Sequence, residues 1–384
     1  MGANFLRAEG LGREFARQGH DVWLAGPRGR WEPPTGSPAV DELRIVRSPG
    51  IGRRLLLPAA FSPLATLGVL ASVRKLAPHI VHSFGHRPAA SIPARFLQKG
   101  QGARHVADWS DWWGGGGIAA ERSWVGRTTV GALDAVFERW SRVSADGLTA
   151  STSHLAAMAR SWGVDSERLL RLPGGARVDV IRPLPMAAAR LKYGLSAEDR
   201  ILVHAGQSAF DLGFLVDCFA EIHRHEPQAR LMVIGGNQRR LSQLSRRHGL
   251  MERVLVWKRV PIASLGELLA CGEVMLLPFP NLGLNLGRFP NRLGDYLSAG
   301  RPVVTNTTGD VGRLIEENAI GLAVEPTSQA TAQAALRVLS DPVLAAELGN
   351  RGREFAEQRM AWSILASEVL AFYARLPQRV EYPR

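Results

Sequence analysis

Cysteine is nearly absent from this 384-residue chain, which contains only Cys218 and Cys271. Two cysteines cannot form the disulfide framework of a small secreted fold, and so few thiols fit a reducing compartment. The first residues also lack the basic segment followed by an apolar segment that directs a chain to export. We therefore expect a cytoplasmic protein.

Long uncharged apolar runs are scarce as well. The one candidate, residues 55–73, carries no charge and is flanked by two basic residues on each side. Pro58, Pro63 and Gly68 weaken it as a continuous spanning helix. We expect residues 65–76 to form a buried helix. The alternative is a segment that docks on a membrane surface, because apolar residues flanked by cations suit anionic lipid.

Basic residues outnumber acidic residues, and the excess is larger in the first half of the chain than in the second. Residues 1–183 hold 24 Lys and Arg against 15 Asp and Glu, whereas the remaining 201 residues hold 23 against 20. A basic N-terminal half favours an anionic partner such as a phospholipid or a phosphorylated substrate, although a solvated basic surface would look the same. No helix-turn-helix, RRM or zinc pattern accompanies the charge, so we do not expect nucleic-acid binding.

What the sequence does contain is an alternation of short apolar runs and amphipathic helices, typical of α/β units around a parallel sheet. Residues 172–185, with two glycines and three prolines, interrupt it and predict a linker. We expect two Rossmann-like lobes with parallel sheets facing a central cleft, at residues 1–183 and 184–360. A last helix, within residues 361–384, is expected to cross back to the first lobe.

The start of the chain departs from the usual pattern of such a lobe. A doubly wound lobe opens with a strand and a Gly-rich turn, whereas here residues 1–4 run directly into a helix. We expect the first strand of the N-terminal lobe to be missing from this chain. The alternative is a divergent lobe that does without it.

The segment PNRLGDYLSAGRPVV, residues 290–304, predicts a nucleotide site. Pro290 precedes a helix, whose first turn offers unpaired N–H groups to a diphosphate. Arg292 adds a cation that is unfavourable at a helix start without an anion. Asp295 lies near the same face and can accept hydrogen bonds from ribose hydroxyls. The alternative is a surface ion pair between Arg292 and Asp295, which would contribute little stability.

Four segments together resemble the family 4 glycosyltransferases of the GT-B fold. Residues 17–22 are similar to that family's "RGHeV", residues 145–153 to "aDvvtavS", and residues 172–179 to "iPNGvD". Residues 290–304 are similar to "PxKxxEYxAxGxPVV", with Arg for Lys and Asp for Glu. The resemblance implies metal-independent transfer of a sugar from a nucleoside diphosphate sugar, with retention and with no further cofactor.

The resemblance also implies a donor site in the second lobe, at the carboxyl edge of its sheet. Arg292 is expected to stabilise the leaving diphosphate. The predicted donor-binding residues are Asp295, Arg292, Gly206, Gln207, Gly235, Arg259, Val260, Asn285 and Gly287.

Two departures from the family pattern concern the donor site. The family often has an acid where Gly287 stands, and an Arg and a Lys where Gln207 and Leu212 stand. Leaving-group stabilisation depends on such cations, so Arg292, the helix N-terminus and the backbone amides of Gly206 or Gly287 are expected to replace them. The alternative is a catalytically impaired relative that binds a nucleotide sugar or glycan. A nucleotide-sugar epimerase would need acid–base carboxylates in this lobe, where the sequence shows no firm set.

The first lobe is expected to hold a glycan, lipid-linked or small-molecule acceptor, such as a cell-envelope polysaccharide precursor, at the inner face of the membrane. Indole rings suit sugar faces, and residues 114–117, four glycines, suggest a loop that closes over substrate. The alternative is that the tryptophans pack in the core. No third ligand accompanies the two aspartates of this segment, so no metal site is predicted. The predicted acceptor-binding residues are His82, His86, Arg87, Trp112 and Trp113, and the predicted catalytic residues are Asp108, Asp111 and Arg292.

Overall fold

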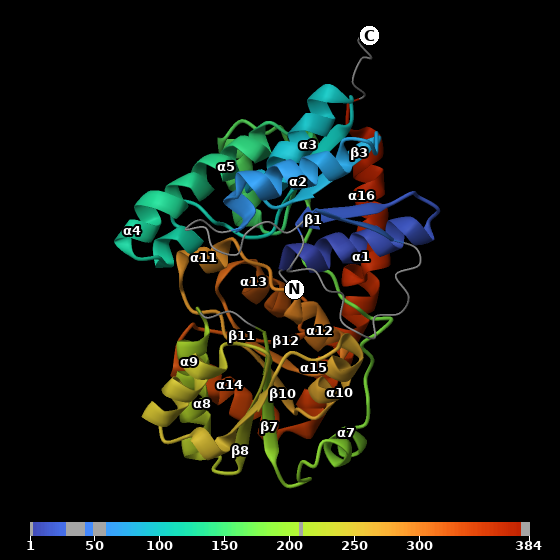
Figure 1. Ribbon diagram of the computed structural model, residues 1–384. Coiled ribbons are helices and arrows are strands. Elements are labelled where there is room, and N and C mark those ends of the chain that lie inside the picture. The colour runs from blue at the N-terminus through green and yellow to red at the C-terminus, as the bar shows by residue number, and fades with distance from the viewer. Residues whose placement is uncertain (1–2, 28–42, 49–58, 207–209, 378–384) are drawn as a thin grey trace.

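The computed structural model describes residues 3–27, 43–48, 59–206 and 210–377, which form two α/β lobes (Figure 1). All strands of the first lobe are parallel, in a two-stranded sheet β1-β2 and a four-stranded sheet β3-β4-β5-β6. The elements of this lobe are α1 (Ala3–Arg17), β1 (Trp23–Pro27), β2 (Arg44–Ser48), α2 (Pro63–Val73), β3 (Ile80–Phe84), α3 (Pro88–Gly100), β4 (Arg104–Trp109), α4 (Trp124–Gly126), α5 (Ala132–Val143), β5 (Gly147–Ala150), α6 (Ser153–Ser161) and β6 (Leu169–Arg171).

The second lobe contains one six-stranded parallel sheet in the order β12-β11-β10-β7-β8-β9. The prediction of two lobes with parallel sheets is therefore confirmed. The elements after the first lobe are α7 (Met186–Lys192), β7 (Arg200–Ala205), α8 (Leu212–His225), β8 (Ala229–Ile234), α9 (Gln238–Arg247), β9 (Val254–Trp257), α10 (Ile262–Ala270), β10 (Val274–Leu277), α11 (Gly283–Leu286), α12 (Arg292–Ser298), β11 (Val303–Asn306), α13 (Gly309–Glu317), β12 (Gly321–Val324), α14 (Ser328–Ser340), α15 (Pro342–Phe355) and α16 (Trp362–Arg375).

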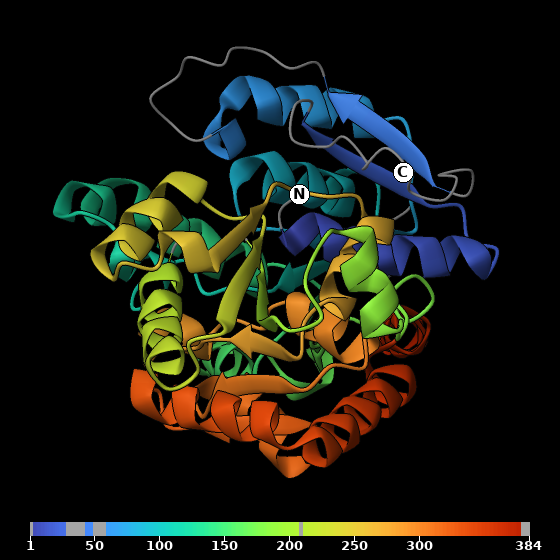
Figure 2. The same cartoon turned by 90° about the horizontal axis from the view of Figure 1, so that it is seen from below.

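Helices cover both faces of the second-lobe sheet, as the side chains of β7 show. Successive side chains of a strand point to opposite faces. Leu202 packs with α8, α9 and α14, whereas Ile201 and Val203 pack with α10, α12 and α13 (Figure 2). Because both faces are buried, the central strands are nearly continuous apolar runs, as in β10, Val274–Leu277.

The last helix, α16, packs on the first lobe. Its buried side chains, among them Leu365, Val369 and Phe372, form one core with Leu11 of α1 and Val106 of β4. In Figure 1 this helix, in red, stands beside α1 and reaches up along the first lobe. The carboxyl end of the chain thus ties the two lobes together.

The uncharged run at residues 55–73, considered above as a membrane segment, is half buried in its described part. In this run α2 begins at Pro63, because Ser62 caps it and proline suits the first helical position. Its inner face is buried, with Val69 and Val73 packed against Leu97 of α3, as expected for a core helix. Residues 55–58 lie outside the described residues. No helix within the described ranges is long and apolar enough to cross a bilayer.

The lobes contact each other through Asp310, at the start of α13. Its carboxylate accepts hydrogen bonds from the backbone N and the Oγ of Ser153, at 2.7 and 2.5 Å, and from Arg171 at 2.6 Å. Both partners belong to the first lobe. The junction between the lobes is therefore fixed by a charge-assisted cluster rather than by apolar packing alone.

Candidate functional site

The candidate site begins where β7 ends and α12 starts. The backbone N of Ala205 donates to the hydroxyl of Tyr296 at 2.6 Å, which holds α12 against the end of this central strand. The chain then turns at Gly206, whose φ is +148°. A Cβ on Gly206 would lie 2.7 Å from Nη1 of Arg292, so only glycine leaves room for the guanidinium. The sequence thus places a cation at the carboxyl end of β7.

His204 holds that cation in place. Its Nδ1 lies 3.0 Å from the carbonyl oxygen of Leu276, and its Nε2 lies 2.8 Å from Nη1 of Arg292. A carbonyl only accepts, so Nδ1 carries the proton and Nε2 accepts from the guanidinium. Burial, reinforced by the charge of Arg292, lowers the pKa of His204 to about 3, which keeps the ring neutral. The ring is therefore a fixed acceptor for Arg292.

A second arginine, Arg288, lies beside the first. It makes a bidentate pair with Asp211, at 3.1 and 3.0 Å, and donates to Oδ1 of Asn285 at 2.6 Å. Nη2 of Arg292 lies 3.7 Å from the same Asp211 carboxylate. Two guanidinium groups thus share one carboxylate, and the three charges sum to +1. A buried excess of positive charge favours an anionic ligand at this place.

Asp111 faces this cluster from the first lobe. Burial raises the pKa of its carboxyl, and the charge of Arg288 opposes that rise. Asp111 therefore lies within electrostatic range of an arginine from the other lobe. A carboxylate with a raised pKa is a stronger proton acceptor than an ordinary one.

Asp108, the other predicted catalytic acid, has a different environment. Arg7 binds both of its oxygens, at 2.7 and 3.0 Å, and Thr149 donates to Oδ1 at 2.7 Å. Burial alone would raise the pKa of Asp108, but the charge and hydrogen bonds of Arg7 lower it overall. Arg7 also donates to the carbonyls of Leu172 and Pro173. The pair ties α1 to the segment between the lobes, and a catalytic role of Asp108 stays a prediction.

Three of the predicted acceptor-binding residues meet around Asp134 of α5. His86 donates from Nε2 at 2.7 Å, and Arg87 makes a bidentate pair at 2.8 and 3.0 Å. The guanidinium of Arg87 lies 4.5 Å from the ring centre of Trp113. His82 lies elsewhere, with Nδ1 at 2.6 Å from the Tyr373 hydroxyl. The structure therefore brings His86, Arg87 and Trp113 together as a support for the loop after β4.

That loop is packed between α5 and the second lobe. Glu138 accepts hydrogen bonds from the indole N of Trp109 and from the backbone N of Trp113 and Gly114, at 2.8, 2.9 and 2.8 Å. A Cβ on Gly114 would lie 2.7 Å from Ala135. Close packing therefore explains Gly114, and closure of the loop over a substrate stays a prediction.

Trp112 explains a departure from the family pattern. A Cβ on Gly287, the position where the family often has an acid, would lie 2.4 Å from the Cβ of Trp112. A carboxylate side chain has no room there while the lobes are in contact. The neighbouring Arg288, which sequence reasoning did not single out, is the residue that turns toward Asp211.

The remaining predicted donor residues lie along the carboxyl edge of the second-lobe sheet. Gly235 follows β8, and Arg259 and Val260 follow β9, the strand next to it. Gln207 lies outside the described residues. Leu212, where the family has its Lys, is buried at the start of α8 and contributes no charge.

Asp295 has a partner other than Arg292. Arg177, from the segment between the lobes, binds both of its oxygens at 2.9 and 2.6 Å, and Asp295 is buried. The alternative of a surface pair between Arg292 and Asp295 is thus wrong. A ribose would have to share the Asp295 carboxylate with Arg177.

Sequence reasoning missed Arg288, His204, Asp211 and Arg177. One indication of Arg288 was present in the sequence, because this residue lies only four positions before Arg292. His204 lies one residue before the end of β7, at the edge where α/β folds bind ligands, which was a weaker signal. Asp211 and Arg177 become recognisable only through their partners. Among the described residues, no group of His, Cys, Asp and Glu could hold a metal ion.

Two parallel-sheet lobes, with arginines gathered at the carboxyl edge of the second sheet, define a protein of the GT-B class. Comparison with known proteins agrees. The family described as "Glycosyl transferase 4-like domain" matches residues 6–175, and "Glycosyl transferases group 1" matches residues 199–341. The chain belongs to the family 4 glycosyltransferases, as the four motifs suggested.

Curated relatives support the assignment. The chain is 23% identical over 238 residues to D-inositol 3-phosphate glycosyltransferase of Segniliparus rotundus, covering 59% of this chain and 52% of the relative. It is 27% identical over 216 residues to the GDP-mannose-dependent alpha-(1-6)-phosphatidylinositol monomannoside mannosyltransferase of Mycobacterium tuberculosis, covering 52% and 54%. The chain spans about half the length of the curated relatives it matches.

A solved structure supports the fold. HepE of Anabaena in complex with UDP-glucose superposes with a TM-score of 0.72 at 16% identity, covering 98% of this chain and 96% of that one. At this identity the likeness establishes the GT-B arrangement of the lobes.

Proposed function

We propose that this protein transfers a hexose from a nucleoside diphosphate sugar to a hydroxyl group of an acceptor, with retention and without a metal ion. The observation that carries the proposal is the pair Arg288 and Arg292 at the carboxyl end of β7. They bring positive charge to the edge of the sheet where the family resemblance places the diphosphate.

The arginines serve the step in which the leaving group departs. The acceptor oxygen bonds to the anomeric carbon while the bond from that carbon to the phosphate oxygen breaks, so negative charge develops on the diphosphate. Preorganised cations stabilise this charge most effectively in a site that excludes water. Because two guanidinium groups supply the positive charge, the reaction does not depend on a chelated metal. The helix α12 has only seven residues, so its N-terminus stabilises the leaving diphosphate less than the two guanidinium groups do.

Asp111 is the proposed group on the acceptor side. Its charge interacts with that of Arg288, and burial raises its pKa, so its carboxylate can receive the proton that the acceptor hydroxyl loses. The retained configuration rests on the family resemblance.

The names of the relatives suggest substrate classes. One relative is named for GDP-mannose and a phosphatidylinositol mannoside, another for inositol 3-phosphate, and the HepE structure contains UDP-glucose. We therefore propose a guanine or uracil nucleotide sugar as donor. The acceptor is a glycan or a lipid-linked, phosphate-bearing molecule at the inner face of the membrane, as in the making of cell-envelope polysaccharide.

A second candidate is a catalytically impaired relative that binds a nucleotide sugar or a glycan. It is favoured by Trp112, which fills the space above Gly287, and by Leu212 in place of a lysine. It differs from the first candidate only in turnover.

Thermal unfolding with UDP, GDP, ADP and TDP, each with and without Mg²⁺, tests the proposal. A nucleotide at about 100 times its dissociation constant should stabilise the protein by roughly 2.7 kcal/mol. We expect one base to stabilise, equally with and without Mg²⁺, and Arg292→Met to remove most of the effect. Arg246→Gln, an exposed arginine of α9, is the matched control.

The outcomes separate the candidates. Nucleotide binding together with release of free sugar or transfer to an added acceptor supports the transferase. Binding without any turnover of the matching sugar nucleotide supports the impaired relative. A folded protein that no nucleotide stabilises overturns both.

A further inference from the structure

The helices on the outside of the first lobe expose many large apolar side chains. Of the 18 exposed large hydrophobic side chains in the described part of the chain, ten lie on α2, α3, α4 and α5. Figure 1 shows these helices as neighbours along the upper part of the molecule. The docking face is defined here as the exposed side chains Ile92, Phe96, Lys99, Trp124, Val125, Arg127, Leu133, Val136, Arg139, Trp140 and Val143.

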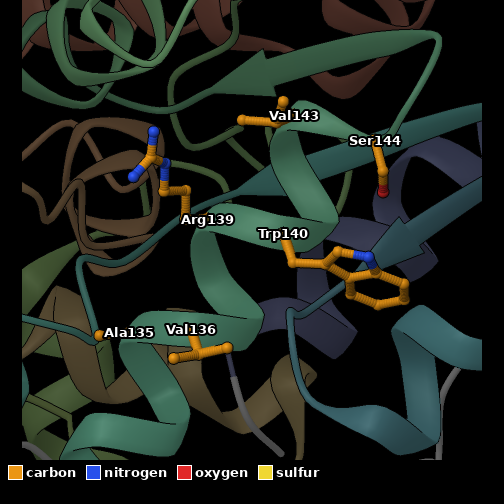
Figure 3. Close-up of a pocket in the computed structure, with 6 residues that line it drawn as sticks. All are labelled: Ala135, Val136, Arg139, Trp140, Val143 and Ser144. Atoms are coloured by element: carbon orange, nitrogen blue, oxygen red, sulfur yellow. The ribbon is translucent and has the colours of Figure 1, made fainter.

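On α5 the usual polarity of a surface helix is inverted. Its acids, Asp134 and Glu138, are 0% and 1% exposed and bind residues of the interior. Its outer face carries Val136, 65% exposed, and Trp140, which line an apolar hollow (Figure 3). A surface helix normally buries its apolar residues and exposes its charges. The apolar outer face of α5 therefore indicates an interaction surface.

The charged side chains of the docking face, Lys99, Arg127 and Arg139, are all basic. Residues 43–107 contain ten Lys and Arg and no Asp or Glu. Arg127 and Arg139 project from the α4–α5 segment, and the exposed acid nearest to them in the sequence is Glu121. Such a face complements an anionic surface and repels a second copy of itself. Apolar side chains interleaved with cations are the composition of segments that lie in the interface of an anionic membrane.

We propose that the docking face binds the surface of a bilayer that contains anionic phospholipid. Trp124, 71% exposed, and Val136 enter the boundary between headgroups and acyl chains, while Arg127 and Arg139 pair with lipid phosphates.

The docking face reaches the candidate site. It ends at α4, which follows the loop at residues 114–117, and Gly116 of that loop contacts Gly283 of α11: its carbonyl oxygen lies 2.6 Å from where a Cβ of Gly283 would be. A lipid-linked acceptor could therefore pass from the bilayer toward the junction of the lobes. This use rests on the proposed transfer, whereas binding to lipid does not.

Co-sedimentation with vesicles tests the inference. Vesicles of phosphatidylcholine alone are compared with vesicles of phosphatidylcholine and phosphatidylglycerol in equal parts. We expect binding to the anionic vesicles only, with weaker binding at high salt, because surface charges are screened. Arg127→Gln with Arg139→Gln should lower the partition coefficient roughly tenfold or more. Trp124→Ser with Val136→Ser should also lower it, without changing nucleotide binding.

Matched controls lie on the second lobe. Leu191→Ser with Val343→Ser changes two exposed apolar side chains, and Arg246→Gln with Arg247→Gln changes two exposed arginines. Both should bind vesicles like the parent. Equal binding by all variants, or no binding to anionic vesicles, overturns the inference. So does a dimer in light scattering that the docking-face variants abolish, because the face would then be an interface between copies. Failure of transfer activity with intact vesicle binding would count against the proposed function alone.

Discussion

Single residues at the end of β7 decide where the positive charge of the site lies. Gly206 leaves the space, His204 supplies a neutral acceptor, and Tyr296 fixes the helix from which Arg292 extends. Residues 206–212 contain no Lys or Arg, and we propose that Arg292, which stands where the family has a Lys, takes over from the cations that the family carries on the loop after β7. This exchange is physically possible because strand end and helix start lie within hydrogen-bond distance of each other.

Gly206→Ala tests this arrangement. The new Cβ would overlap the guanidinium of Arg292 and would add strain at φ +148°, a combined cost of roughly 1–3 kcal/mol. We expect displacement of Arg292 and at least about tenfold weaker nucleotide binding, measured by calorimetry. Gly213→Ala is the control, because nothing lies within 4 Å of a Cβ there. Equal affinities of the two variants would contradict the placement of Arg292 in the donor site.

At the scale of elements, strong periodic segments were predictable and short ones were not. The sequence predicts a strand at residues 147–150 and a helix at residues 238–247, and these match β5 and α9. The three-residue strand β6 and the helix α13 escaped prediction. The strand β6 is short and is held by its pairing with β5. The helix α13 begins with polar residues, among them Asp310, which contacts the first lobe.

Asp310→Ala tests how the elements hold the lobes together. The change removes the acceptor of three hydrogen bonds that join α13 to α6 and β6, at a cost of about 1–3 kcal/mol. We expect a larger radius of gyration in solution scattering, because the lobes separate. Asp341→Ala removes the N-terminal cap of α15 at a cost of about 1 kcal/mol. Identical scattering from both variants would show that Asp310 does not hold the lobes together.

The whole molecule buries several histidines in neutral form, and this sets its response to acid. Burial lowers the pKa of His86 to about 4 and those of His105 and His204 to about 3. Between these values and the unfolded value of about 6.5, the unfolded chain binds more protons than the folded one. Stability therefore rises with pH through this window. Asp111 and Glu138, whose pKa values are raised by burial, reduce the slope.

Urea unfolding at several pH values between 4.5 and 7 measures this effect. Each buried histidine adds a slope of at most about 1.4 kcal/mol per pH unit. We expect the free energy of unfolding to increase over the range, and His105→Gln to flatten the increase. His225→Gln, at an exposed position, should leave the slope unchanged. A flat profile for the parent protein would contradict the neutral burial of these rings.

The sequence by itself determined the two α/β lobes, the parallel sheets and the family, because these depend on local periodicity and on motifs contiguous in the chain. It also predicted a donor site at residues 290–304, and this assignment stays a prediction. Only the tertiary structure decided which partner each charged group has. Arg292 contacts His204 and Asp211, Asp295 binds Arg177, and Trp112 covers Gly287. These pairs join residues 81 to 175 positions apart, so they depend on how the second lobe folds and on how the two lobes pack, which no local pattern records.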